Sequence, residues 1–276
     1  MYELQNRDTS VEDLTQLSAR LQAAVRDAGA LALSLFKTPL KNWTKGPASS
    51  PVCEADIAVD RLLRQRLCGD DGFGWLSEES TDDDRGRLAA RYVWIVDPID
   101  GTRAYIAGLP DWSVSAALVE DGRPVVACLY APVSEEFFMA VRGGGASRNG
   151  SPLAASAGAE LAQARIAGPR KFLERLAASA PPFAIMPRTH SLALRLARVA
   201  QGEFDAAIAG GNSHDWDLAA ADLLVHEAGG ALTPVEGGAV LYNRPVPRHG
   251  LLVAAGRERH AALVDLIRDG RLALPR

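Results

Sequence analysis

The sequence predicts an α/β protein built in layers, on three observations. The chain has 276 residues, 47% of them hydrophobic and 23% charged, which is typical of a globular protein with a large core. Two apolar runs, residues 113–119 and 124–130, flank an Asp-Gly pair, and this pattern predicts an antiparallel hairpin. After residue 150, short apolar runs alternate with amphipathic stretches. We therefore expect an α+β first half and a second half of alternating strands and helices.

The first half is predicted to begin with two helices. Leucines recur at three-, four- and seven-residue steps over residues 14–35, and Pro39 ends this amphipathic pattern. Residues 38–51 are predicted to form a loop. A second helix is expected to begin at Asp56 and to stop at Gly69.

The remaining elements follow from apolar runs and the turn residues between them. Strands are expected at residues 73–76, 92–96 and 136–141, with an acidic loop at 81–85. The Gly-rich residues 142–150 predict a turn-rich break, where we place a subdomain boundary, giving residues 1–150 and 151–276. The elements expected beyond it are strand 164–167, helices 170–178 and 191–200, strand 204–209, helix 217–228, strand 251–254 and helix 258–269.

Composition and charge argue against several classes of partner. The net charge is -4, from 30 Lys and Arg against 34 Asp and Glu, and the chain has no basic run of the kind that binds nucleic acid. It also has no apolar run near the roughly 18–20 residues of a membrane span. The three cysteines are odd in number and show no paired spacing, and the N-terminus is polar. We therefore expect a cytoplasmic protein without nucleic-acid or membrane partners.

Five carboxylates stand at the ends of predicted elements. They are Asp56, Glu78, Asp97, Asp100 and Asp217. The ends of strands and helices converge at one rim of a layered α/β fold, so these side chains can meet there. Carboxylates that are close together repel each other, and a divalent cation removes that repulsion. Oxygen ligands without His or Cys favour Mg²⁺, with Mn²⁺ possible, over Zn²⁺.

The hexapeptide from Asp97 to Thr102 is the strongest local pattern. A buried strand delivers Asp97, and Pro98 turns the chain so that Asp97, the Ile99 carbonyl and Asp100 can surround one pocket. Gly101 and Thr102 then offer backbone N–H groups at a helix start, where anions bind. The alternative is an acidic type I turn with Pro at its second position. An aspartyl-phosphate phosphatase motif does not fit, because its two Asp are two residues apart rather than three.

Four motifs in the same order resemble the inositol monophosphatase superfamily of Mg²⁺-dependent, lithium-sensitive phosphatases. They are the Ser-Pro-Val element ending in Asp56, the pair Glu78-Glu79, the hexapeptide Asp97–Thr102, and Trp216-Asp217-Leu218-Ala219-Ala220 followed by Glu227-Ala228-Gly229-Gly230. The resemblance implies a layered α-β-α-β-α sugar-phosphatase fold and an enzyme that hydrolyses a phosphate monoester. It also implies a small phosphorylated metabolite as substrate and a homodimer as a possible assembly.

The resemblance also implies roles for individual residues, matched by position. The implied ligands of two or three Mg²⁺ ions are Glu78, Asp97, the Ile99 carbonyl, Asp100 and Asp217. Asp56 and Thr102 would activate the attacking water, with Glu78 also serving catalysis through a third, weaker metal. Asp100, Gly101 and Thr102 would hold the phosphate. The metal and phosphate site would then belong to residues 1–150, while residues 151–276 would supply the last metal ligand and the specificity elements.

Each of these residues also has a simpler structural interpretation. Asp56 and Asp217 could be helix N-caps, one of the pair Glu78-Glu79 could face solvent, and Trp216 could be a core residue. The acidic residues 82–84 could form a solvated lid.

Substrate specificity is less determined by the sequence. Residues 209–215 lack the Glu that contacts polyol hydroxyls in inositol monophosphatases, and Thr189-His190-Ser191-Leu192-Ala193 replaces their Gly-Ser/Thr-Ala-Ala stretch. The pair Ser191-Leu192 is similar to the 3'(2'),5'-bisphosphate nucleotidases, and Arg103 before an aromatic residue is similar to the histidinol-phosphate phosphatases. Polyol phosphate, bisphosphate nucleotide and histidinol phosphate stay open as substrates, as does a catalytically idle metal-binding regulator. The candidate specificity residues are Lys45, Arg103 and His214.

Overall fold

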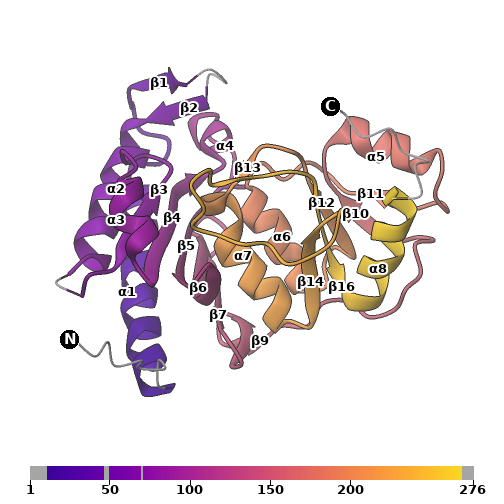
Figure 1. The fold of residues 1–276 in the computed structure, drawn as a ribbon. Coiled ribbons are helices and arrows are strands. Elements are labelled where there is room, and N and C mark those ends of the chain that lie inside the picture. The colour runs from indigo at the N-terminus through magenta and orange to yellow at the C-terminus, as the bar shows by residue number, and fades with distance from the viewer. Residues whose placement is uncertain (1–10, 47–49, 70, 269–276) are drawn as a thin grey trace.

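The computed structural model describes residues 11–46, 50–69 and 71–268, and these form five layers (Figure 1). Helices α1 (Val11–Leu35) and α2 (Glu54–Leu67) cover one face of a seven-stranded sheet. Helices α6 (Leu192–Ala200) and α7 (Asp215–Glu227) lie between this sheet and a second one of five strands. Helices α5 (Arg170–Ala177) and α8 (Arg257–Leu266) cover the far face of the second sheet. The expected α-β-α-β-α arrangement is confirmed.

The seven-stranded sheet is antiparallel except at one edge. Its strands, in both chain and spatial order, are β3 (Gly74–Ser77), β4 (Tyr92–Asp100), β5 (Ser113–Glu120), β6 (Arg123–Ala131), β7 (Glu136–Val141), β8 (Gly145–Arg148) and β9 (Ser151–Pro152). Only β3 and β4 pair in parallel. The predicted hairpin is confirmed: Asp121 and Gly122 have φ values of 47° and 78°, the positive values that a type I′ turn needs.

The second sheet has the spatial order β11-β10-β12-β16-β14. Its strands are β10 (Arg165–Ala167), β11 (Ala184–Ile185), β12 (Ala206–Ala209), β14 (Gly230–Pro234) and β16 (Leu252–Gly256). Strands β10 and β12 run parallel, whereas β16 is antiparallel to β12. The two-residue strands β13 (Ser213–His214) and β15 (Arg248–His249) pair outside it.

Helix α7 lies at the centre of the molecule because nearly all of its sides are apolar. Seven of its residues are buried hydrophobics: Leu218, Ala219, Ala220, Ala221, Leu223, Leu224 and Val225. They share one core cluster with residues of both sheets. A helix that is hydrophobic all round is stable only when it is enclosed. The central layer therefore joins the two sheets, and the division into subdomains near residue 150 stays a prediction.

The structure corrects three sequence-based expectations. Residues 38–51 do not form a loop throughout, because β1 (Asn42–Lys45) pairs with β2 (Ser50–Cys53). The acidic segment is not simply a solvated loop, since it leads into α3 (Asp84–Ala89). There the Asp83 side chain accepts a hydrogen bond from the Gly86 N–H and so caps the helix. The Gly-rich break contains β8 and continues the sheet.

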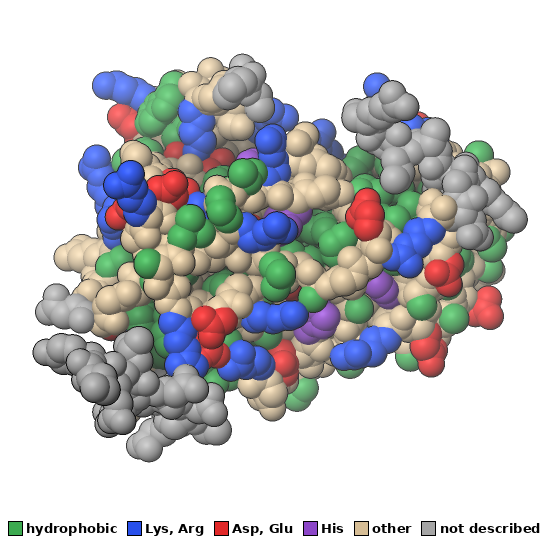
Figure 2. Space-filling view, in the orientation of Figure 1, with side chains coloured by type: hydrophobic (Ala, Val, Ile, Leu, Met, Phe, Trp, Pro, Cys, Tyr) green, Lys and Arg blue, Asp and Glu red, His purple; other side chains and the backbone are tan. Residues whose placement is uncertain are grey.

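The distribution of surface charge and the character of the helices are relevant to nucleic-acid and membrane partners. On the face shown in Figure 2, acidic and basic side chains are interspersed among apolar and neutral ones. Within the described residues, no helix is long and apolar enough to cross a membrane. The cytoplasmic location stays a prediction.

Candidate active site

The ends of four elements bring the five predicted carboxylates to one place. Asp97 and Asp100 come from the end of β4, and Asp217 comes from the first turn of α7. Oxygens of these three side chains all lie within 4.8 Å of one another. The charges of Glu78, which follows β3, and of Asp56, on α2, both act on Asp97. All five predicted carboxylates therefore belong to one site, which we call the carboxylate cluster.

Burial and mutual repulsion disfavour the charged forms of these groups. Burial, followed by the charges of Glu78, Asp100 and Asp217, holds the pKa of Asp97 well above its usual value. Burial and the nearby Asp217 raise the pKa of Asp100 to about 7. Burial also raises the pKa of Glu78 to about 8, although Lys45 opposes the shift. A bound cation would offset the cost of charging these buried groups at neutral pH, and the all-oxygen donor set fits a hard divalent ion.

Strand β4 continues through Asp100, four residues past its predicted end at residue 96, and is irregular where the hexapeptide lies. The β4–β5 register shifts between Asp97 and Asp100, and the Ile99 N–H donates to Asp97 Oδ1 at 3.0 Å. Gly101 has a φ of 96° and caps α4 (Thr102–Ile106). A Cβ at Gly101 would lie only 3.1 Å from the Asp111 carbonyl oxygen, so this turn requires glycine.

Asp56 is held by its own helix and by Thr102. The Thr102 hydroxyl lies 3.0 Å from both Asp56 Oδ1 and the Ile99 carbonyl oxygen. The Cys53 N–H and thiol donate to Asp56 Oδ2 at 2.9 and 2.8 Å. The expectation that Asp56 is an N-cap is wrong in detail: Cys53 is the N-cap, and Asp56 is the third helical residue of a capping box.

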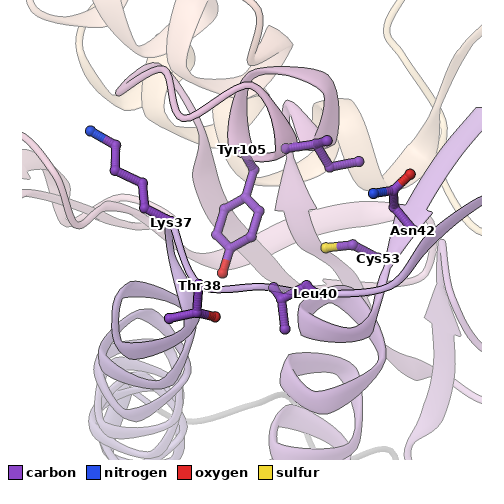
Figure 3. Close-up of a pocket in the computed structure, with 7 residues that line it drawn as sticks. Lys37, Thr38, Leu40, Asn42, Cys53 and Tyr105 are labelled. Atoms are coloured by element: carbon purple, nitrogen blue, oxygen red, sulfur yellow. The ribbon is translucent and has the colours of Figure 1, made fainter.

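The cysteine behind Asp56 remains a neutral thiol. Burial and the neighbouring Asp56 raise the pKa of Cys53 to about 12. Figure 3 shows its sulfur beside a cavity of about 70 Å³ that Leu40, Asn42 and Tyr105 also line. The thiol therefore donates a hydrogen bond to the carboxylate and adds no charge to the site.

Asp217 has the same local position as Asp56. It is the third residue of α7, and its Oδ2 accepts a hydrogen bond from the His214 N–H at 2.6 Å. His214 stacks on Trp216 with ring centroids 4.6 Å apart and planes 2° apart. This fixes the imidazole beside the carboxylate, with Nδ1 3.8 Å from Asp217 Oδ2. Trp216 is half-buried against the core, as the simpler interpretation expected.

Lys45 links the β1–β2 hairpin to the carboxylates. Its Nζ donates to the Glu78 carbonyl at 2.7 Å and to Glu79 Oε1 at 2.6 Å, and it lies 3.4 Å from Glu78 Oε1. The Glu79 side chain is only 2% exposed, so neither member of the pair simply faces solvent. Arg103 is exposed on α4, and its role in specificity stays a prediction.

Two contacts of Asp100 were not predicted from the sequence. The Ser191 hydroxyl and the Ala193 N–H both donate to Asp100 Oδ2 at 2.6 Å. Ser191 also caps α6 by accepting from the Leu194 N–H at 2.9 Å. Serine before an apolar helical run is a cap signal, and that signal could have drawn attention to this residue.

Comparisons with known proteins show which proteins this chain is similar to. The model of the "Inositol monophosphatase family" matches residues 13–271. An inositol-1-monophosphatase of Rhizobium meliloti is 35% identical over 236 residues, which cover 80% of this chain and 86% of that protein. A histidinol-phosphatase of Mycobacterium tuberculosis is 37% identical over 205 residues, covering 69% and 76%.

Solved structures share the fold. The crystal structure of the extragenic suppressor protein suhB from Bartonella henselae superposes with a TM-score of 0.79 at 29% identity, covering 92% of this chain and 99% of that one. The family match extends over nearly the whole chain, and a relative at 35% identity covers 80% of it. The chain therefore belongs to the inositol monophosphatase family and is a phosphoric monoester hydrolase.

Proposed function

We propose that this enzyme uses Mg²⁺ to hydrolyse the phosphate monoester of a small hydroxylated metabolite, such as inositol monophosphate or a related polyol phosphate. The observation that carries the proposal is the carboxylate cluster, in which oxygens of Asp97, Asp100 and Asp217 lie within 4.8 Å of one another. Asp97 and Asp100 are 1% and 6% exposed, and burial makes uncompensated charge there costly. The preference for polyols rests on relatives that are named inositol monophosphatases.

The residues that would hold two or three Mg²⁺ ions are Glu78, Asp97, the Ile99 carbonyl, Asp100 and Asp217. When bound, the ions supply positive charge that offsets these carboxylates and stabilises charge developing on the phosphoryl group. Mn²⁺ offers the same preference for oxygen ligands.

Asp56 and Thr102 are suited to orienting the attacking water. The Thr102 hydroxyl donates to Asp56 Oδ1 at 3.0 Å, which leaves a lone pair on Thr102 Oγ1 to accept a hydrogen bond from water. Because burial raises the pKa of Asp56, its carboxylate is a stronger base than an exposed one. The backbone N–H groups of Gly101 and Thr102 would hold the phosphate at the start of α4, beside Asp100.

Histidinol phosphate is a second candidate substrate, because a relative 37% identical to this chain is named a histidinol-phosphatase. The test is phosphate release from inositol 1-phosphate, histidinol phosphate, adenosine 3',5'-bisphosphate and fructose 1,6-bisphosphate, each with Mg²⁺ and with EDTA. We expect turnover that depends on Mg²⁺ and a clear order in kcat/KM.

A variant pair makes the test specific to the cluster. Asp97→Asn should abolish turnover, because it removes a central charge and keeps the oxygen that accepts from the Ile99 N–H. Asp121→Asn, on the exposed β5–β6 turn, should retain activity. Full activity of Asp97→Asn would contradict the metal-site assignment. No turnover of any substrate by the folded protein with Mg²⁺ would favour an idle regulator.

A further inference from the structure

Arg87, on α3, is a buried guanidinium that lies outside the carboxylate cluster. Its side chain is fully buried, and its Nε and Nη2 donate to Asp82 Oδ1 and Oδ2 at 2.6 and 2.7 Å. Its Nη1 donates to Asn243 Oδ1 and to the Arg244 carbonyl, both at 3.0 Å. Asn243 Nδ2 in turn donates to the Arg87 carbonyl at 3.0 Å. These contacts tie the segment that follows Glu78 to the loop between β14 and β15.

The same loop fastens the first turn of α7. The Asn243 N–H donates to Asp215 Oδ2 at 2.7 Å, and His249 Nε2 lies 2.7 Å from Asp215 Oδ1. Asp215 is the first residue of α7 and its side chain is fully buried, so both of its carboxylate oxygens are held from outside the helix. His249 belongs to β15, which pairs with β13 just before α7. Asp217 follows two residues later on the same turn.

These five side chains form one connected set, which we call the bridging network: Asp82, Arg87, Asn243, Asp215 and His249. It joins two segments that carry predicted metal ligands, namely the residues that follow Glu78 and the first turn of α7 with Asp217. Ionised carboxylates at the spacing of the carboxylate cluster repel one another. A buried network whose polar groups have partners is rigid, and it can therefore hold such ligands at their spacing.

We propose that Arg87 and His249 are positioning residues, which set the spacing between the segments of Glu78 and Asp217 and thereby the affinity of the site for Mg²⁺. The inference rests on the proposed function, in which both carboxylates are metal ligands. Each residue acts through the segment that it holds. Replacing groups that support metal ligands from behind commonly weakens metal binding by roughly 10- to 100-fold.

The test follows Mg²⁺ binding as well as activity. Melting temperature is measured in EDTA and across a Mg²⁺ titration, and phosphate release gives the Mg²⁺ concentration for the half-maximal rate. His249→Leu should raise that concentration by about tenfold, with most of kcat recovered at saturating Mg²⁺. At a fixed, low Mg²⁺ concentration its melting temperature should rise less than that of the wild type. His249→Gln should restore most of the affinity, because its amide can donate to Asp215 Oδ1 in place of the imidazole.

Arg87→Lys tests the other end of the bridging network. It keeps the positive charge, but one ammonium group cannot replace the planar fork that holds Asp82 and Asn243 together. We expect the Mg²⁺ response to weaken as it does in His249→Leu. If Arg87→Lys does not fold, His249→Leu still decides the question, because His249 is only partly buried and lies on the two-residue strand β15.

Two residues of α8 provide matched controls on the opposite side of the molecule from α3 (Figure 1). Arg259 is a second buried arginine, which donates to the Ser156 hydroxyl and to the Glu160 carbonyl, both at 2.9 Å. His260 is also partly buried, with Nε2 3.0 Å from Thr233 Oγ1. Arg259→Lys and His260→Leu should lower the melting temperature in EDTA and leave the response to Mg²⁺ unchanged.

The outcomes separate this inference from the proposed function. If no substrate is hydrolysed but Mg²⁺ raises the melting temperature of the wild type more than that of His249→Leu, the bridging network positions a metal site and the hydrolytic proposal fails. An active enzyme in which His249→Leu and Arg87→Lys keep the wild-type response to Mg²⁺ would overturn the inference. An equal loss of that response in His260→Leu would also overturn it, because lower stability alone would then explain the change.

Discussion

The stability of the metal-free protein should fall as the pH rises through neutrality. In the folded chain, burial and neighbouring carboxylates raise the pKa of Asp100 from 3.8 to about 7, and burial raises that of Glu78 from 4.5 to about 8. A carboxyl group whose pKa is raised by folding binds its proton more tightly in the folded state. Its contribution to stability is complete below the unfolded pKa and is lost as the pH passes through the folded pKa.

The size of the effect follows from these two groups. One pKa unit corresponds to about 1.4 kcal/mol, so from about pH 5.5 to about pH 8 either group alone lowers the free energy of unfolding by roughly 2 to 3 kcal/mol. The two losses do not simply add, because both groups are repelled by Asp217. For a chain of this length, the loss from one group corresponds to a drop in melting temperature of roughly 5 to 10 °C.

Thermal melts followed by circular dichroism across this pH range, in EDTA and in Mg²⁺, measure the effect. Mg²⁺ should flatten the dependence because it binds the charged carboxylates. Asp97→Asn should flatten it in EDTA and melt above the wild type at about pH 8, because it removes one of the repelling charges. The pKa of His226 is raised by its hydrogen bond to Asp222, so this residue also lowers stability as the pH rises. Because His226 is present in both the wild type and Asp97→Asn, it does not account for a difference between them. A wild-type melting temperature in EDTA that stays constant or rises would refute the reasoning.

Three further changes test single contacts of the site. Thr102→Val should lower kcat by about 10²- to 10⁴-fold and also lower the melting temperature, because Asp56 Oδ1 loses its buried donor. Thr102→Ser should retain most activity in the phosphate-release assay, and equal rates for both variants would remove the hydroxyl from the mechanism. Cys53→Ala should lower the free energy of unfolding in urea by about 1 kcal/mol through loss of the thiol hydrogen bond to Asp56 Oδ2, and Cys53→Thr, whose hydroxyl can donate instead, should not. Equal stability of the two variants would contradict the role of this hydrogen bond. Lys45→Gln should destabilise the protein by about 1–2 kcal/mol at about pH 8, because it leaves Glu79 buried without its cation, and a smaller effect at about pH 5 would identify that carboxylate as the cause.

The hexapeptide is a part of the site whose arrangement depends mainly on neighbouring residues. A buried strand, a proline and a glycine fix the path of the chain between Asp97 and Thr102, and all the groups involved are neighbours in sequence. The site carboxylates could also be identified from the sequence, because each stands at the end of an element whose apolar pattern is strong. The positions of Asp56 and Asp217 within their helices were harder to predict, because Cys53 and His214 are unusual N-caps.

Some contacts of the site form between segments that are far apart in the sequence and share no pattern that predicts their contact. One cavity is lined by residues 168–170, by the loop before α6 and by the Arg195 side chain of α6. Residues 42–53 carry no strong strand pattern, and their pairing places Lys45 against Glu78 and Glu79. No local sequence pattern predicts these contacts between distant segments.

The sequence by itself determined the layered fold, the β5–β6 hairpin and the choice of carboxylates, because periodicity, turn residues and charge act between chain neighbours. Only the tertiary structure decided how close those carboxylates lie, which groups shift their pKa values, and that Ser191 connects α6 to Asp100. The physical reason is that α7 is buried between two sheets. Enclosing that apolar helix fixes its first turn, and with it Asp217, against the end of β4.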